Sequence, residues 1–240
     1  MSMNSWTLFS KQGRKRSLMF DSLDAINFET STIIYDDVFE NILTKVYQCY
    51  EMMLKEVQSV ANDENSIRDV LLKSYLKNNK IRRLVGFNTD QVNFEREVPE
   101  DHSTGRTDIK VTTINTFDEQ DEYYTLECKR LDNTNTQGST GLNAKYVENG
   151  VYRFTSKFYS SFCRVNAMVG FLVEDMDIHK NTENINNLLL QNKFITTKKK
   201  ITQSNFINNC DYHYHSEHID SGNEHLKIYH LMLDFNRLVS

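Results

Sequence analysis

Proline is nearly absent from this chain, and so are the features that define several other classes of protein. The 240 residues contain one proline, Pro99, and eight glycines, too few for the flexible or extended linkers that join independent domains. No apolar run approaches the length of a membrane-spanning helix, about 20 residues. The N-terminal segment is polar and does not resemble a secretory leader. We therefore expect a cytoplasmic protein with no membrane partner.

Cysteine is present, but not in pairs. The four residues Cys49, Cys128, Cys163 and Cys210 are widely spaced and form no Cys-x-x-Cys motif. This spacing favours free thiols in a reducing compartment. The formal net charge of −5 argues only weakly against a nucleic-acid partner, because binding depends on the local distribution of charge.

Hydrophobic periodicity divides the chain into helices and strands. Spacings of three and four predict helices at residues 36–60, 64–78, 145–162 and 181–194, the first of them capped near Asp36. Alternation and short apolar runs predict strands at residues 91–99, 106–114, 122–131, 167–175 and 226–235. The first three of these strands should form an antiparallel meander, joined at its second corner by the acidic turn FDEQD.

The order helix, three strands, helix, strand predicts an α/β (α+β) fold. We expect a central mixed sheet with an antiparallel three-strand meander, flanked by helices, and an N-terminal helical extension. Residues 1–62 would form an arm and the long amphipathic helix, with SWTLFS and STIIYDD as an arm or strand, and residues 63–240 would form the main domain. The apolar stripe of helix 36–60 must pack on that domain, on a second copy of the chain or on a partner subunit.

Charged residues lie inside two of the predicted strands, GRTDIK at 105–110 and YTLECKRL at 124–131. Because side chains alternate along a strand, Glu127 and Lys129 share one face while Cys128 points to the other. If the two strands are neighbours, Asp108 lies beside Glu127. Two close carboxylates repel each other and lose hydration, so this position requires a positive charge.

A divalent cation supplies such a charge. Mg²⁺ prefers hard oxygen ligands and takes one or two carboxylates, so we expect Asp108, Glu127 and the main-chain carbonyl of Cys128 as ligands, with Mn²⁺ as a substitute. Lys129 would position or deprotonate a water and stabilise charge on a phosphate. This set predicts hydrolysis of a phosphodiester. The alternative is a cross-strand ion pair between Lys129 and Asp108 or Glu127.

These residues and the order of elements resemble the PD-(D/E)XK nuclease superfamily, which has the restriction-endonuclease-like fold. The signature of that family is an Asp on the second core strand and Glu-x-Lys on the third, matched here by Asp108, Glu127 and Lys129. Thr107 stands where the family motif has proline. The resemblance covers residues 63–175. With the stretch KYVENGVYRF included, the chain also resembles small bacterial nucleases linked to phage defence.

The resemblance implies a Mg²⁺-dependent nuclease, for which we expect DNA as the substrate and a role in anti-phage defence. An RNA or tRNA nuclease of the same fold, and a non-catalytic nucleic-acid-binding or assembly subunit, are the alternatives. Helix 36–60 would then contact a second copy or an ATPase or sensor subunit. Many members of the family add a Glu from the first core helix to the site; Glu64 matches it by position, and Glu97 is its rival.

The helix at 145–162 follows the Glu-x-Lys strand and, by the same resemblance, borders the site. It carries Arg153, whose forked guanidinium suits phosphate oxygens, with Tyr146 on the same face and Lys145 as a weaker point charge. Lys110 lies two residues after Asp108 on the same strand and shares its face. We expect these four residues to contact nucleic acid; core packing of the tyrosine and ion pairs of the cations are the alternatives.

The stretch CDYHYHSEH brings Cys210, His213, His215 and His218 close together in sequence. Cysteine and histidine in a short loop can complete a tetrahedral zinc site. The spacing fits no common zinc finger, however, and His-x-His in a strand alternates across the sheet. Both a zinc site and a surface element that leads into the last strand remain open.

Overall fold

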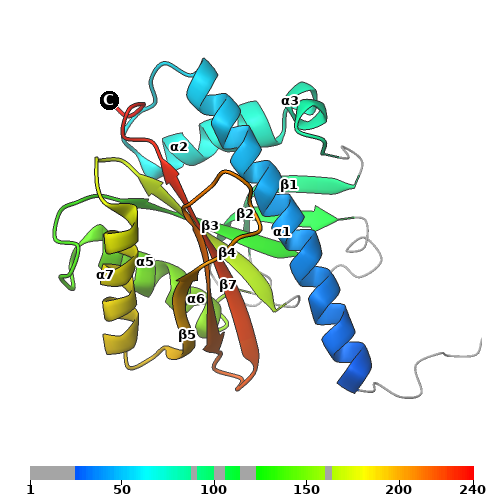
Figure 1. The fold of residues 1–240 in the computed structure, drawn as a ribbon, viewed down its shortest axis with the longest axis vertical. Coiled ribbons are helices and arrows are strands. Elements are labelled where there is room, and N and C mark those ends of the chain that lie inside the picture. Colours follow the sequence, from blue (N-terminus) through cyan, green and yellow to red (C-terminus); the bar gives the residue numbers. More distant parts are fainter. Residues whose placement is uncertain (1–24, 88–90, 100–105, 114–122, 160–163) are drawn as a thin grey trace, which may run out of the picture.

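The computed structural model describes residues 25–87, 91–99, 106–113, 123–159 and 164–240. They form a seven-stranded mixed sheet with helices on both faces (Figure 1). The strands are β1 (Val92–Pro99), β2 (Arg106–Thr113), β3 (Tyr124–Leu131), β4 (Val165–Leu172), β5 (Thr196–Gln203), β6 (His213–Ile219) and β7 (His225–Asp234). The helices are α1 (Ala25–Glu56), α2 (Glu64–Val70), η1 (Leu71–Leu76), α3 (Asn79–Leu84), α5 (Leu142–Tyr146), η2 (Val147–Val151), α6 (Tyr152–Thr155) and α7 (Ile178–Gln191).

The predicted meander is confirmed, and it forms one end of the sheet. The strand order is β1-β2-β3-β4-β7-β6-β5, with β1, β2 and β3 antiparallel to one another. β3, β4 and β7 are parallel, so the chain must cross over between them, and the continuous helix α5–η2–α6 makes the crossover from β3 to β4. β5 and β6 complete the other end as antiparallel strands. The predicted turn FDEQD lies outside the described residues.

Helix α1 packs on this sheet as part of the core. Its apolar stripe, with Phe39, Leu43, Val46 and Met53, is buried, and the Phe39 ring stacks on Tyr124 of β3 with centroids 4.5 Å apart. Figure 1 shows α1 running diagonally across the sheet. Of the three alternatives for this stripe, packing on the main domain is the one that the structure shows.

Two predictions about this N-terminal region are wrong. The segment STIIYDD, expected as an arm or strand, belongs to α1, and Asp36 is not a helix cap because the helix already begins at Ala25. Asp36 instead accepts a hydrogen bond from Lys227 Nζ at 2.8 Å. One cluster of buried residues joins α1 to the sheet and the C-terminus. The SWTLFS segment lies outside the described residues.

Other element boundaries differ from the predictions by a few residues, and two strands were missed. The helix expected at 145–162 occupies α5 to α6 and ends at Thr155, before Lys157 at a positive φ of 59°. β5 was missed because its exposed lysines give it no apolar alternation: only Ile201 of its eight residues is buried. β6 corresponds to the histidine-rich stretch. Burial alternates along it, but several of its residues are histidines and not apolar side chains, so apolar alternation did not reveal the strand.

The two faces of the sheet have separate hydrophobic cores. One cluster contains α1, η1 and residues such as Leu126 and Cys128 of β3, as expected for the face opposite Glu127. The other contains α5–α6, α7 and residues such as Leu131 and Met168. Within the described part of the chain, no helix combines the length and apolar character needed to cross a membrane.

A chain of buried hydrogen bonds links three elements on the second face. Tyr146 Oη lies 2.8 Å from His230 Nδ1, His230 Nε2 lies 2.8 Å from Ser216 Oγ, and Ser216 Oγ lies 2.7 Å from His218 Nε2. Burial, and then the charge of His225, lower the pKa of His218 to about 4. Burial likewise holds the pKa of His230 well below its ordinary value, so both rings are neutral at pH 7.

Phe39→Ala tests whether α1 belongs to the core. Removing a fully buried phenylalanine should lower the free energy of unfolding by about 3–5 kcal/mol, measured by urea denaturation. Leu54→Ala is the matched control on the same helix, since Leu54 is 39% exposed and its loss should change stability by about 0.5 kcal/mol or less. Equal effects of the two substitutions would contradict the packing of α1 described above.

The buried histidines predict acid sensitivity. Between a pH of about 6.5, where an unfolded histidine titrates, and a pH of about 4, the folded pKa of His218, the unfolded state binds a proton that the folded state excludes. Stability should therefore fall with decreasing pH by about 1.4 kcal/mol per pH unit for each such histidine. His218→Gln should show a shallower slope in urea denaturation across this range, and an unchanged slope would contradict the buried neutral state of His218.

Candidate functional site

The two strands that carry the predicted acids part from each other at those acids. Regular pairing of β2 with β3 ends at Ile109 opposite Leu126, so Asp108 and Glu127 are the next pair in the same register. There the main-chain N–H of Cys128 donates to Asp108 Oδ2 at 2.9 Å, in place of a strand carbonyl. A side-chain carboxylate thus replaces main-chain pairing where the strands separate, and Asp108 lies beside Glu127 as predicted.

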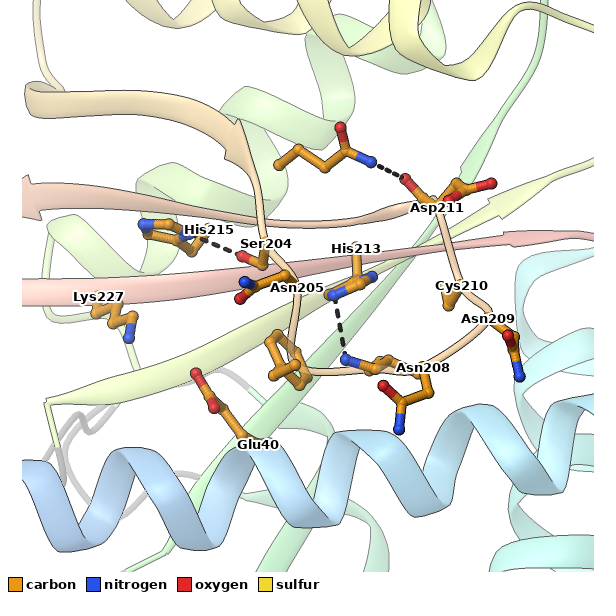
Figure 2. A pocket seen from close by; sticks show the side chains of 13 residues that line it. Glu40, Ser204, Asn205, Asn208, Asn209, Cys210, Asp211, His213, His215 and Lys227 are labelled. Atoms are coloured by element: carbon orange, nitrogen blue, oxygen red, sulfur yellow. Dashed lines mark hydrogen bonds between the residues drawn. The ribbon is translucent and has the colours of Figure 1, made fainter.

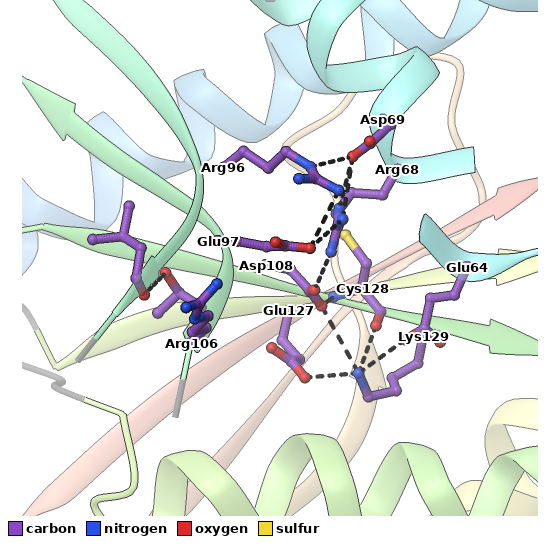
Figure 3. A network of polar contacts seen from close by, with 12 residues as sticks. Glu64, Arg68, Asp69, Arg96, Glu97, Arg106, Asp108, Glu127, Cys128 and Lys129 are labelled. Carbon is purple, nitrogen blue, oxygen red and sulfur yellow. Dashed lines mark hydrogen bonds and ion pairs between the residues drawn. The ribbon is translucent and has the colours of Figure 1, made fainter. Parts of the chain in front are cut away.

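Lys129 lies at the centre of the acids. Its ammonium is 2.7 Å from Glu127 Oε1, 2.7 Å from the Cys128 carbonyl oxygen, 3.3 Å from Glu64 Oε1 and 3.8 Å from Asp108 Oδ2 (Figure 3). We call these five residues the acid–lysine cluster. The cluster contains the cross-strand ion pairs that were the alternative to a metal site. It also joins three carboxylates and a carbonyl to one ammonium, which is more than a single ion pair requires.

Burial makes the charges of this cluster interdependent. Glu127 is 1% exposed, and burial together with the nearby Asp108 carboxylate raises its pKa to about 7, although Lys129 and Arg153 oppose the shift. Burial alone would lower the pKa of Lys129, but the surrounding carboxylates, led by Glu127, outweigh it and raise that pKa. The Lys129 ammonium is therefore charged at neutral pH and compensates the buried acids.

Of the two rival glutamates, the structure places Glu64 in the cluster. Asp63 caps α2 by accepting the N–H of Ser66, which puts Glu64 on the first turn facing β3. Its Oε2 accepts the main-chain N–H of Arg130 at 2.9 Å, and its Oε1 faces Lys129. Glu97 Oε1 instead accepts Arg68 Nη2 at 2.9 Å.

Arg153 reaches the cluster from α6. Its Nη1 donates to Glu127 Oε1 at 3.1 Å and to Tyr159 Oη at 2.8 Å, and the tyrosine hydroxyl donates to Glu127 Oε2 at 2.9 Å. Both Glu127 oxygens are thereby held. The guanidinium remains partly exposed, with 35% of its side chain accessible, at the rim of a cleft.

That cleft has a volume of about 520 Å³ and opens directly onto the acids. Its lining residues are Asp63, Glu64, Asn65, Asp108, Glu127, Lys129, Arg130, Leu142, Lys145, Asn149 and Arg153. The acids therefore have access to an external ligand, with Lys145 and Arg153 as cations on the helical side of the cleft.

Two residues expected to contact nucleic acid lie elsewhere. Tyr146 is fully buried, and its hydroxyl is engaged by His230; its expected role is corrected, because a side chain inside the core cannot reach a polymer. Lys110 does not line the cleft, and its ammonium lies 3.9 Å from the ring centroid of Tyr123. The alternatives of core packing and local pairing describe these two residues better.

Sequence reasoning missed two residues that contact the acids, Arg68 and Tyr159. Arg68 lies one helical turn after Glu64, a spacing that places both side chains on one face of α2, and its Nη1 donates to Asp108 Oδ1 at 2.7 Å. That i, i+4 spacing was the available signal. Tyr159 lies beyond the end of α6 at Thr155, although its spacing had placed it within the helix predicted at residues 145–162.

The oxygens of the cluster fit a hard divalent cation. Asp108, Glu127 and the Cys128 carbonyl, with Glu64 beside them, are the donor types that Mg²⁺ and Mn²⁺ accept, and all four oxygens face one cationic atom, Lys129 Nζ. Among the described residues, no group of three or more His, Cys, Asp or Glu side chains is spaced to hold a metal ion. In the structure, the Lys129 ammonium is the positive charge that these oxygens contact.

The histidine-rich stretch does not form a comparable centre. β6 directs His213 and His215 to one face and His218 to the other, where it joins the buried hydrogen-bond chain. His213 Nε2 accepts the N–H of Ile207, and His215 Nδ1 pairs with Ser204 Oγ. These two histidines line a polar hollow of about 670 Å³ together with the loop before β6 and Glu40 of α1. Figure 2 shows the side chains around it.

Cys210 also lines this hollow, as a buried free thiol. The described Cys49 and Cys128 are free and buried as well, in agreement with the expected absence of pairing among them; Cys163 lies outside the described residues. The dispersal of the histidines offers no support for zinc.

Comparison of the chain with protein-family models, with curated proteins and with solved structures found no match. The function of the cleft therefore rests on its own geometry and chemistry.

Lys129→Met tests whether the ammonium and a cation share one position. Without the ammonium, the buried acids are uncompensated, which for a broken buried pair costs about 3–5 kcal/mol, so the metal-free variant should melt lower than wild type. A cation that fills the same position should then raise the melting temperature more in the variant than in wild type, measured by a Mn²⁺ titration.

The matched control is Lys200→Met, since Lys200 pairs with Glu183 on the surface and should leave the Mn²⁺ response unchanged. Absence of any Mn²⁺ response in Lys129→Met would show that these oxygens do not bind a cation.

Proposed function

We propose that this protein is a Mg²⁺-dependent nuclease that hydrolyses phosphodiester bonds, with DNA as its substrate, on a restriction-endonuclease-like core. The observation that carries the proposal is the convergence of three carboxylates, a main-chain carbonyl and a lysine where two antiparallel strands separate, in an open cleft. A buried carboxylate with two further acids close by is costly to maintain, and a bound cation would offset this cost.

The order of elements supports the assignment of the core. Helix α2, the meander β1–β2–β3, the crossover helix α5–α6 and the parallel strand β4 follow one another in the order implied by the family resemblance. Asp108 lies on the second meander strand, and Glu127 and Lys129 lie on the third. The proposal therefore rests both on the order of the helices and strands and on the position of the Asp and Glu-x-Lys residues on the second and third meander strands.

In this proposal, Asp108, Glu127 and the Cys128 carbonyl hold Mg²⁺, and Glu64 contributes from α2. When bound, Mg²⁺ would offset charge on the phosphodiester and acidify a coordinated water. The burial of Glu127, together with its hydrogen bonds from Arg153 and Tyr159, keeps the Glu127 carboxylate in one orientation, with Oε1 directed toward Lys129. This orientation is set before any substrate arrives.

Lys129 and the basic residues of the cleft act on the substrate. Once withdrawn from the acids, the Lys129 ammonium donates hydrogen bonds to the attacking water and to a phosphate oxygen, where negative charge grows as the bond breaks. The partly exposed guanidinium of Arg153 offers forked donors to a neighbouring phosphate, and Lys145 adds a point charge on the same helical surface. A role in anti-phage defence remains part of the proposal.

A non-catalytic binding subunit is the competing proposal from another class. A site that only binds a polyanion gains nothing from Asp108, Glu127 and Glu64 in its cleft, because these acids repel phosphate. Their presence, with a lysine between them, favours catalysis.

The test is incubation of the purified protein with supercoiled plasmid, linear DNA and tRNA, with Mg²⁺, with Mn²⁺ and with EDTA. We expect metal-dependent cleavage of DNA and loss of cleavage in Lys129→Ala, because this variant lacks the ammonium beside Glu127. Asp108→Asn should also lose activity through weaker metal binding. Circular dichroism should show that both variants are folded, and Lys200→Ala is the control that keeps wild-type cleavage.

Cleavage by Lys129→Ala at the wild-type rate, or cleavage in EDTA, would refute the proposed catalytic set. Metal-dependent cleavage of tRNA alone would retain the chemistry and replace DNA by RNA as the substrate. Binding of DNA without cleavage under any metal condition would favour the non-catalytic subunit.

A further inference from the structure

A second network of charged residues contacts Asp108, and the other residues in it do not line the cleft. At its centre is Arg68, 1% exposed, whose guanidinium reaches three carboxylates: Nη1 donates to Asp108 Oδ1 at 2.7 Å, and Nη2 donates to Glu97 Oε1 at 2.9 Å and to Asp69 Oδ1 at 3.2 Å (Figure 3). Arg96 closes the network through Nε, 2.7 Å from Asp69 Oδ1.

We propose that Arg68 is a positioning residue that orients Asp108 for binding the catalytic cation. This inference rests on the proposed nuclease function, in which Asp108 is a metal ligand.

The two oxygens of Asp108 have different partners, which is the basis of this role. Oδ1 is bound by Arg68 from behind, while Oδ2 accepts the N–H of Cys128 and faces Lys129 at 3.8 Å. Rotation of the carboxylate would break a charge-assisted hydrogen bond to a buried guanidinium, which is among the stronger kinds of hydrogen bond. Only Oδ2 is therefore presented toward the acid–lysine cluster.

Helix α2 connects both separated strands. Glu64 accepts the main-chain N–H of Arg130 on β3, and Arg68, one turn later, donates to Asp108 on β2. The i, i+4 spacing places the two side chains on one face of the helix. One helical face thus joins the strands at the point where their own pairing has ended, and it holds the acids of the two strands in register.

The backbone of β1 is adapted to the same network. Glu97 has a φ of 47°, a left-handed conformation that is strained and uncommon for a residue with a side chain. Consecutive strand residues normally point to opposite faces, yet Arg96 and Glu97 both contact residues of α2. A strained strand residue that supplies a carboxylate to Arg68 is consistent with a functional demand on the position of this arginine.

The experiment compares wild type with Arg68→Met and Arg68→Lys, using isothermal titration with Mn²⁺ and the Mg²⁺ concentration that gives half-maximal cleavage. Loss of a residue that orients a metal ligand lowers metal affinity by about 10- to 100-fold. Arg68→Met should therefore raise the dissociation constant for Mn²⁺ and the half-maximal Mg²⁺ concentration by that factor. Arg68→Lys should recover part of the loss, because an ammonium keeps the charge but lacks the forked donors.

Arg96→Met is the matched control. Arg96 shares Asp69 and Glu97 with Arg68 but makes no described contact with Asp108, so its loss should lower the melting temperature and leave the metal dependence at the wild-type value. A purely structural role of Arg68 would give the same pattern in both variants, a lower melting temperature with unchanged metal dependence.

The outcomes separate this inference from the function on which it rests. If wild type neither binds Mn²⁺ nor cleaves, the proposed function fails and this inference with it. If wild type responds and a folded Arg68→Met binds Mn²⁺ equally well, only the role of Arg68 is overturned. Should Arg68→Met not fold, Arg68→Lys decides the question: a raised dissociation constant supports the inference, and an unchanged one overturns it.

Discussion

The fold and the proposed chemistry both depend on the buried carboxylate of Glu127 and the cation that compensates it. An ionised carboxylate out of water is costly, and a second one on the neighbouring strand raises that cost. Lys129 offsets it from the same strand face, while Arg153 and Tyr159 hold the two Glu127 oxygens. Because these partners come from β3, α6 and the segment after α6, the arrangement exists only when the sheet and the crossover helix are both in place.

The separation of β2 and β3 is the second constraint, because it opens the sheet where the acids lie. Continuous strand pairing there would leave no room for a main-chain N–H to bind Asp108 Oδ2. Helix α2 replaces the missing pairing with Glu64 on one strand and Arg68 on the other. The cleft thus has an acidic floor, and Arg153 and Lys145 form a basic side. This polarity suits a cation beneath a phosphate.

The sequence predicted the features that depend on local pattern. Alternation located the three meander strands, and the two-residue period of a strand placed Glu127 with Lys129 on one face. The pattern failed where tertiary contacts decide the outcome. Exposed lysines gave β5 no apolar alternation. Tyr146 was expected on the same helix face as Arg153, yet its side chain is buried in the second hydrophobic core. Arg68 was overlooked because a buried arginine is recognisable only once its three acids have been brought together from β1, β2 and α2.

The central claim is that the acid–lysine cluster binds a divalent cation in the position held by the Lys129 ammonium. The most direct measurement is a crystal structure of the protein soaked in Mn²⁺, with anomalous scattering used to locate the ion. The account predicts an anomalous peak in contact with Asp108, Glu127 and the Cys128 carbonyl, with Lys129 Nζ withdrawn from Glu127. Absence of the peak at saturating Mn²⁺, with Lys129 still 2.7 Å from Glu127 Oε1, would contradict it.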